Sequence, residues 1–209
     1  MYILDYSFKS KKDISFIIDR DHEFNWLSSF DTNPYNRIHL ILDSNFNKKW
    51  GSLLISKLKK HQIEINIYKI KGAESSKSIN NFISLVSELE KNGLNRYDVM
   101  IVVGGGVVLD IAGFVASVYM RGVPLILVPT TLIGQVDAST AGKTCINSEN
   151  SKNLIGTYYF PVTVYNNIRF LDTLNRYHFR QGFSEIFKYG LLGSKKLIDL
   201  LMKYNKKAD

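Results

Sequence analysis

Three consecutive glycines, Gly104–Gly106, interrupt an apolar stretch in the middle of the chain. The residues before them, Val99–Val103, form a continuous apolar run typical of a buried strand, and Val107–Tyr119 continues with helical spacing. A glycine turn between a strand and a helix lets the backbone approach a ligand and presents N–H groups at the positive end of the helix dipole. The spacing therefore predicts a site for a phosphate group.

The same loop also has a purely structural interpretation, because strand–glycine–helix junctions are common tight turns. The spacing here is Gly-Gly-Gly-x-x-x-Asp, ending at Asp110, and it does not match the dinucleotide fingerprint Gly-x-Gly-x-x-Gly. An acidic residue early in a helix also stabilises the helix dipole without any ligand. The glycine loop alone therefore leaves both interpretations open.

Polar side chains follow the other predicted strands. Pro124–Val128 ends in Thr130 and Thr131, and the segment Gln135–Thr144 is rich in hydroxyl, carboxylate and ammonium groups. Asp43 and Asn45 follow an early strand, and Glu74 and Lys77 follow the next one. The ends of parallel strands line the ligand crevice of open α/β sheets, although helix caps and solvated charges would explain the same residues.

The elements around these residues alternate between strand and helix. Strands are predicted at Ile38–Leu42 and Ile63–Ile70, and helices at Phe46–Lys60 and Ser78–Asn92. Such alternation predicts an α/β fold with a Rossmann-like, mostly parallel sheet. Strand-forming residues also occur at Met1–Leu4 and Ile14–Ile18, and further helices are predicted at Phe179–Leu192 and Lys195–Tyr204.

Composition excludes several classes of protein. The net charge is +8, but the lysines are scattered and lack interleaved aromatic residues, so we expect no nucleic-acid partner. The longest apolar stretch is broken by the glycines and Asp110, so we expect no membrane span. With one cysteine and no secretion signal at the N-terminus, we expect a cytoplasmic protein.

Taken together, the motifs resemble the 3-dehydroquinate synthase family of sugar-phosphate cyclases. The segments that carry the resemblance are GGGVVLDIAGFVASVYMRGVP, VPTTLIGQVDAS, AGKTCIN, KNLIGTYYFP and GFSEIFKYGLL. The resemblance implies an NAD-binding α/β domain over residues 1–175. It implies that residues 176–209 begin an α-helical metal and substrate domain that is truncated here. It also implies a homodimer when the chain is complete.

The resemblance assigns roles residue by residue. It implies that NAD contacts Asp43, Asn45, Glu74, Lys77, Gly105, Gly106, Val107, Val108, Leu109, Asp110, Thr130, Thr131, Lys143, Lys152, Phe170, Leu171, Asp172 and Thr173. It implies that the phosphate, carboxylate and hydroxyls of a sugar phosphate contact Arg121, Asp137, Lys143, Lys152, Asn153 and Lys188.

For the divalent metal, zinc or cobalt, the resemblance assigns Glu185. The two histidines that complete the family's site lie farther along the chain in its members. His178 is seven residues before Glu185, about 10 Å along a helix and too far to share an ion. His22, His39 and His61 lie outside any matching motif, so we expect weak zinc binding and little turnover from this chain. The helices Phe179–Leu192 and Lys195–Tyr204 carry apolar faces that would normally be covered by the rest of a helical domain, so we also expect self-association.

The implied reaction converts 3-deoxy-D-arabino-heptulosonate 7-phosphate to 3-dehydroquinate in the shikimate pathway of aromatic amino acid biosynthesis. NAD oxidises a ring carbinol, phosphate is eliminated, the ketone is reduced again, and the ring opens and closes by an aldol step. Leu109 and the Asp137–Ala138 pair also resemble relatives that cyclise sedoheptulose 7-phosphate. Ala73, Ala141 and Asn167 depart from the family pattern. An NAD-dependent polyol dehydrogenase and an inactive NAD-binding fragment remain alternatives.

Overall fold

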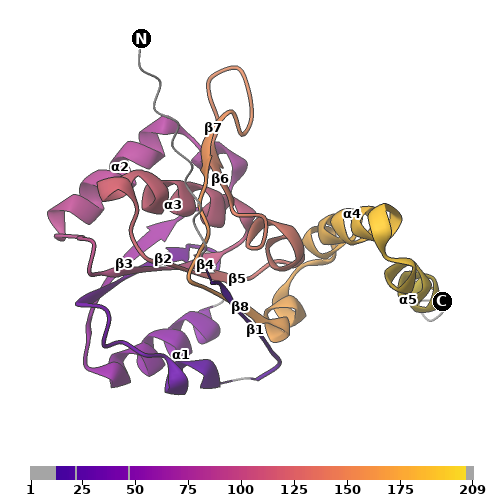
Figure 1. Ribbon diagram of the computed structural model, residues 1–209, viewed down its shortest axis with the longest axis horizontal. Helices are drawn as coiled ribbons and strands as arrows, with labels where there is room; N and C mark the ends of the chain where they lie inside the picture. The colour runs from indigo at the N-terminus through magenta and orange to yellow at the C-terminus, as the bar shows by residue number, and fades with distance from the viewer. Residues whose placement is uncertain (1–12, 22, 47, 206–209) are drawn as a thin grey trace, which may run out of the picture.

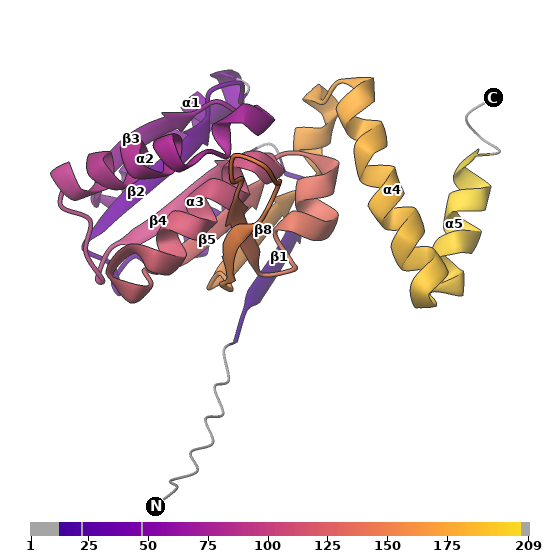
Figure 2. The ribbon, with the colours of Figure 1, turned by 90° about the horizontal axis from the view of Figure 1, so that it is seen from above.

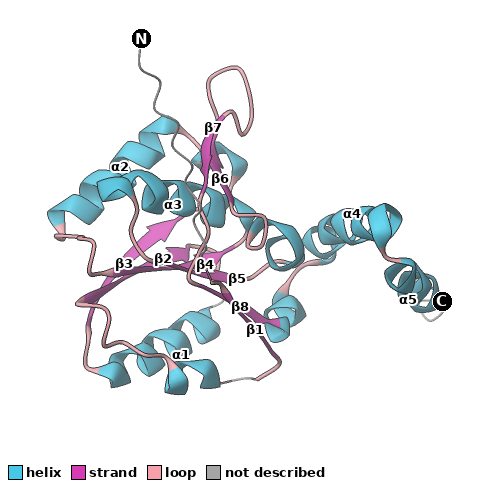
Figure 3. Ribbon diagram, in the orientation of Figure 1, coloured by secondary structure: helices cyan, strands magenta, loops and turns pink. Residues whose placement is uncertain are grey.

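A six-stranded parallel sheet forms the centre of the molecule in the computed structural model, which describes residues 13–21, 23–46 and 48–205. The strand order is β1-β8-β5-β4-β2-β3, and every neighbouring pair is parallel. Figure 3 shows the strands as one twisted layer between helices. The bounds are β1 Ser15–Asp19, β2 Arg37–Asp43, β3 Glu64–Ile70, β4 Val99–Gly104, β5 Leu125–Pro129 and β8 Thr163–Asn167.

Helices cover both faces of this sheet. Helices α2 (Ile79–Lys91) and α3 (Gly106–Val118) lie on one face, and α1 (Lys48–Leu58) lies on the other (Figure 1). This arrangement confirms the predicted Rossmann-like α/β fold. The helix expected at Ser78–Asn92 starts one residue later because Ser78 is its N-cap and accepts a hydrogen bond from the Asn81 N–H.

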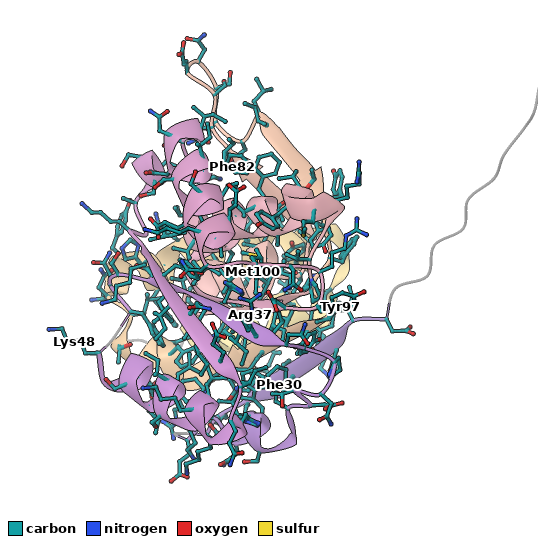
Figure 4. The ribbon with its side chains drawn as sticks, turned by 90° about the vertical axis from the view of Figure 1, so that its left-hand side faces the viewer. Phe30, Arg37, Lys48, Phe82, Tyr97 and Met100 are labelled. Atoms are coloured by element: carbon teal, nitrogen blue, oxygen red, sulfur yellow. The ribbon has the colours of Figure 1, made fainter. Side chains whose placement is uncertain are left out.

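The two faces of the sheet bury separate apolar cores. Phe82 packs against the core beneath α2 and α3, and Phe30 packs against the core beneath α1. Figure 4 shows these two side chains on opposite sides of the sheet, with Met100 between them. Strand β4 is buried along its whole length, as expected for a central strand covered on both faces.

A two-stranded antiparallel hairpin packs outside α3 and was not predicted. It consists of β6 (Lys143–Ile146) and β7 (Ile155–Tyr158). The polar segment Gln135–Thr144 includes most of a π-helical turn, Gly134–Ala138, and the first two residues of β6. A Cβ atom at Gly113 would lie 2.7 Å from Cγ2 of Thr144, so the hairpin reaches α3 closely at this point.

Helices α4 (Arg176–Gly193) and α5 (Lys195–Asn205) form a pair that projects from the α/β body (Figure 2). Both helices were predicted, but α4 begins earlier than Phe179 because the Asn175 side chain accepts a hydrogen bond from the His178 N–H. No helix among the described residues has the length and apolar character needed to cross a membrane. Two predictions, the strand at Met1–Leu4 and the role of His22, fall outside the described residues.

Candidate functional site

Polar and glycine residues from several strands meet at the carboxyl edge of the sheet. Asp43 ends β2, Glu74 follows β3, Gly105 follows β4, Thr130 follows β5 and Thr173 follows β8. All of them line a cavity of ≈ 580 Å³, which we call the loop cavity. Its predicted lining residues are Asp43, Asn45, Glu74, Gly105, Val107, Thr130, Thr131, Phe170 and Thr173.

A second cavity of ≈ 690 Å³ lies between α3 and the β6–β7 hairpin, and we call it the hairpin cavity. Its predicted lining residues are Glu74, Lys77, Gly106, Val107, Asp110, Asp137, Lys143 and Asn153. Glu74, Val107 and Gln181 line both cavities. The two spaces are therefore adjacent along the carboxyl edge, where open α/β sheets bind ligands.

The backbone of the glycine loop provides donors to both spaces. The N–H groups of Val108 and Leu109 donate to the carbonyl of Gly105, and their side chains are buried. Helix geometry leaves the N–H groups of Gly106 and Val107 without an acceptor inside α3. Of the predicted loop residues, Val108 and Leu109 therefore do not present a donor or a side chain to either cavity.

Gly105 has little room for a side chain. A Cβ atom there would lie 3.0 Å from Cγ2 of Thr131, and Thr131 is itself fixed by the Gly134 N–H, which donates to its hydroxyl at 3.2 Å. The loop, Thr131 and the π-helical turn consequently form one packed unit at the N-terminus of α3.

Lys77 lies in a buried polar cluster. Its side chain is 4% exposed, and Nζ donates to Oδ2 of Asp110 at 2.6 Å and to Oδ1 of Asn153. Burial alone would lower the pKa of Lys77, but the hydrogen bond and the charge of Asp110 outweigh it and hold the pKa above its ordinary value. Lys77 is therefore protonated and joins the loop after β3 to α3 and to the hairpin.

Cys145 borders the same cluster, because its Sγ lies 3.4 Å from Nζ of Lys77. Burial, followed by the charge of Asp110, raises the pKa of the Cys145 thiol. Because a thiol must ionise to act as a nucleophile, this cysteine has no signature of a catalytic thiolate.

A chain of amides extends the cluster into the loop between β6 and β7. The side chain of Asn147 donates to Oε1 of Glu74 at 2.9 Å and accepts from the Asn153 N–H at 2.8 Å. The Asn147 N–H donates to the carbonyl of Lys77 at 2.7 Å. Glu74 and Asn153, expected on the cofactor and substrate sides respectively, are thus linked through one side chain.

Helix α4 contacts the hairpin cavity through Asp137. The hydroxyl of Tyr189 donates to Oδ1 of Asp137 at 2.6 Å. On the same helix Lys188 forms an ion pair with Glu185, and Nζ of Lys188 lies 5.0 Å from the centre of the Tyr189 ring. The hydrogen bond to Glu185 raises the pKa of Lys188.

The structure does not bring every predicted residue to the cavities. Besides Val108 and Leu109, the residues that line neither one are Arg121, Lys152, Leu171, Asp172, Glu185 and Lys188. Arg121 follows α3 and precedes β5, which places it at the amino edge of the sheet, opposite the glycine loop. Lys152 is exposed in the loop between β6 and β7.

The described residues do not fit a complete metal site. Within residues 13–21, 23–46 and 48–205, no three His, Cys, Asp or Glu side chains are placed to hold an ion together. Glu185 instead pairs with Lys188. His39 is buried in the sheet, where its Nδ1 lies 2.9 Å from the Tyr68 hydroxyl, and His178 lines the loop cavity.

Several residues at the site were missed from the sequence. Gln181 lines both cavities. The buried side chain of Gln135 donates to the carbonyls of Pro129 and Asn167, which ties the ends of β5 and β8 together. Gln181 directly precedes the segment GFSEIFKYGLL, and Tyr189 lies inside it. Gln135 lies inside the segment VPTTLIGQVDAS, and Asn147 ends the segment AGKTCIN. For all four residues, the usable signal was their position in or beside a matched segment.

Comparison with known proteins agrees with this architecture. The family model described as 3-dehydroquinate synthase N-terminal matches residues 67–181. The 3-dehydroquinate synthase of Alkaliphilus oremlandii is 44% identical over 161 residues, which cover 77% of this chain and 44% of that protein. That of Oceanobacillus iheyensis is 40% identical over 181 residues, covering 86% of this chain and 49% of that protein. The chain spans about half the length of these relatives.

Solved structures of cyclases share the fold. The 2-epi-5-epi-valiolone synthase from Streptomyces hygroscopicus, with NAD+ and Zn2+ bound, superposes with a TM-score of 0.86 at 28% identity, covering 97% of this chain and 56% of that one. A 2-deoxy-scyllo-inosose synthase complexed with carbaglucose-6-phosphate, NAD+ and Co2+ gives 0.74 at 26% identity, covering 83% and 47%. The fold together with these similarities identifies an α/β protein of the sugar-phosphate cyclase type.

Within that class, the chain belongs to the 3-dehydroquinate synthase family. The fold is not confined to cyclases. An NADH-dependent butanol dehydrogenase from Thermotoga maritima has a TM-score of 0.68 at 17% identity, covering 88% of this chain and 50% of that one.

Proposed function

We propose that the loop cavity binds NAD, with its pyrophosphate against the glycine loop. The observation that carries this proposal is that Gly105 and Val107 line this cavity at the N-terminus of α3, where the Val107 N–H has no acceptor inside the helix. Asp43 and Asn45 would contact the adenosine end, and Thr130 and Thr131 the opposite side of the cofactor. Each cavity is within the usual size range of small-molecule sites.

We also propose that the hairpin cavity holds a sugar phosphate beside the nicotinamide. Lys143 contributes a cation at the start of β6, while Asp137 and Asn153 contribute a carboxylate and an amide for hydroxyl groups. NAD, when bound, supplies reversible hydride transfer at a ring carbinol. The residues of this chain bind and orient the anionic substrate around that centre.

The function supported best is therefore that of a 3-dehydroquinate synthase, a phosphate-eliminating lyase. Support comes from the identity of 44% to the Alkaliphilus oremlandii protein and from the paired cavities. Cyclisation of sedoheptulose 7-phosphate is the second candidate, favoured by Leu109 and the Asp137–Ala138 pair. The likeness to the butanol dehydrogenase supports the fold alone.

The proposal for helices α4 and α5 concerns their domain and one metal ligand only. We propose that α4 and α5 begin a helical domain that starts near residue 176 and that Glu185 contributes one carboxylate to a divalent metal. No step of the reaction is assigned to that metal, because the described residues provide no matching ligands. A cytoplasmic homodimer is the proposed setting of the whole protein.

A comparison of ligands tests the proposed function. The chain is incubated with NAD and a divalent metal, together with one of three candidates: 3-deoxy-D-arabino-heptulosonate 7-phosphate, sedoheptulose 7-phosphate or a polyol. Phosphate release from the first supports the proposal, and release from the second alone favours the other cyclase. Net NADH formation from the polyol indicates a dehydrogenase. Binding of NAD without turnover of any candidate is the result expected of these 209 residues, because their metal ligands are incomplete. The same assay on the chain joined to a helical segment that supplies two histidines then distinguishes the two functions, because a cofactor-binding fragment would still show no turnover.

A further inference from the structure

Tyr189 contacts the hairpin cavity indirectly, through Asp137. Its hydroxyl donates to Oδ1 of Asp137 at 2.6 Å, a short distance typical of a hydrogen bond to an ionised carboxylate. This hydrogen bond, followed by burial, raises the pKa of the Tyr189 hydroxyl, which therefore stays protonated and keeps donating at neutral pH. Asp137 has its other carboxylate oxygen left for a ligand in the cavity that it lines.

The backbone that carries Asp137 is unusual. Asp137 belongs to the π-helical turn Gly134–Ala138, and such turns are rare and concentrate at functional sites. The hydrogen bond that the Asp137 carboxylate accepts comes from Tyr189 on α4, outside this turn. The orientation of the Asp137 carboxylate therefore depends on a partner outside its own element.

Helix α4 meets the segment that leads into this turn at a second point. A Cβ atom at Gly182 would collide with the side chain of Leu132, so the helix backbone lies directly against the start of the turn. Gly182 and Tyr189 are seven residues apart, which places them on one face of α4. The backbone of α4 thus contacts Leu132 at Gly182, and the hydroxyl of Tyr189 on the same face holds the Asp137 carboxylate.

We propose that Tyr189 is a positioning residue that orients Asp137 toward the sugar phosphate and thereby couples α4 to the substrate side of the site. Tyr189 remains 38% exposed, so its packing contribution is limited and its hydroxyl is the feature that matters. The inference rests on the proposed function, because it assumes that Asp137 contacts the substrate.

A double-mutant cycle in the 209-residue chain tests this role. Binding of 3-deoxy-D-arabino-heptulosonate 7-phosphate to the NAD-loaded chain is measured for the parent, Tyr189→Phe, Asp137→Asn and the double variant. We expect Tyr189→Phe to weaken binding about tenfold, as loss of one hydrogen bond to a charged group does. The double variant should bind no more weakly than Asp137→Asn, because the tyrosine acts through the carboxylate. NAD affinity should change less than twofold in Tyr189→Phe.

The matched control is Tyr177→Phe, which removes a hydroxyl from an exposed tyrosine on the same helix that lines neither cavity. Its affinity for both ligands should equal that of the parent. Unchanged binding in Tyr189→Phe, or additive losses in the double variant, would overturn the proposal.

A spectroscopic readout separates this inference from the proposed function. If the parent chain binds no sugar phosphate, the proposed substrate assignment fails, and the nuclear magnetic resonance signal of the tyrosine 13Cζ decides the positioning role alone. The proposal predicts that Asp137→Asn moves the Tyr189 signal and that Tyr189→Phe moves the Asp137 13Cγ signal, with α4 otherwise unchanged. Absence of both shifts would show that the hydrogen bond does not form and would overturn the proposal.

Discussion

The carboxyl edge of the sheet and helix α4 hold their charged groups in different ways. At the sheet edge, Lys77 is 4% exposed and its ammonium is enclosed by Asp110 and Asn153. On α4, Lys188 pairs with Glu185 one turn away, and its side chain is 49% exposed. One region places its groups through buried packing between several elements, and the other through contacts within a single helix.

Packing of the described fold therefore fixes the position of Lys77, whereas the side chain of Lys188 remains free to adopt other positions. Removing one member of a buried ion pair leaves an uncompensated charge and is strongly destabilising, whereas exposed pairs contribute little. Apolar residues follow the same division: Val102 in β4 is fully buried, but Phe187 and Leu200 on the helices are about half exposed. The comparison predicts that substitutions of equal chemistry have unequal effects in the two regions.

The largest effect is expected from Lys77→Met. Loss of the ammonium leaves the carboxylate of Asp110 without its charged partner, and we expect the free energy of unfolding to fall by about 3 kcal/mol in urea denaturation. The additional substitution Asp110→Asn should recover part of that loss. Lys188→Met is the matched control and should leave the urea midpoint nearly unchanged. Equal losses in both variants would remove the distinction between the two regions.

A smaller effect is expected on ligand binding when the cavity loses its cation. Lys143→Ala should weaken binding of the sugar phosphate by about 1.5–3 kcal/mol in calorimetry, because a charge-assisted hydrogen bond is lost, and should change NAD affinity less. Lys152→Ala, in the adjacent exposed loop, should have the smaller effect because Lys152 lines neither cavity. If Lys152→Ala is the more damaging variant, the loop between β6 and β7 must close over the ligand.

Stability should also depend on pH through His39 in the sheet. Burial lowers the pKa of His39 and outweighs the opposite influence of Asp98, while Arg37 adds to the lowering. The unfolded chain therefore takes up this proton more readily, and stability is lost as the pH falls below about 6.5, by at most about 1.4 kcal/mol per pH unit. His39→Gln should reduce the difference between the unfolding free energies measured at about pH 7.5 and about pH 5.5. An unchanged difference would show that His39 does not contribute.

The smallest effect on stability is expected on the projecting helices. Phe187→Ser combined with Leu200→Ser should change the free energy of unfolding by less than about 0.5 kcal/mol, because both side chains are about half exposed. The same variant should reduce self-association in sedimentation velocity, because it breaks an exposed apolar surface. Self-association equal to that of the parent would place the contact elsewhere.

The sequence predicted the parts of the fold that depend on local patterns. Apolar runs such as Val99–Val103 and the helical pattern at Ser78–Asn92 mark their elements within a residue or two. The β6–β7 hairpin was missed because its strands, KTCI and IGTY, are only four residues long and too short to show a clear alternating pattern. The hairpin packs closely on α3, which the sequence pattern does not reveal.

The site likewise contains residues that local patterns could predict and residues that only tertiary packing brings together. Residues after the strand ends, such as Asp43 and Thr130, could be placed because the sheet topology brings strand ends together. The partners of Lys77 and Asp137 could not be found from spacing, because they are separated by tens of residues and meet only through tertiary packing. The family resemblance assigned Arg121 to the substrate, but the structure places it at the amino edge of the sheet, opposite the glycine loop. A motif match thus suggests a role without giving a position in the fold.

The most direct test of the account is the titration of NAD into the 209-residue chain and into Gly105→Val, followed by calorimetry. The chain should bind NAD with one site. The valine should abolish measurable binding, because its side chain enters the space beside Thr131, which is where we propose that the pyrophosphate binds. Gly193→Ala is the control, since a Cβ atom there meets no other atom within 4 Å, and it should bind as the parent does. Equal NAD affinity in Gly105→Val and the parent, with both folded by circular dichroism, would contradict the assignment of the glycine loop.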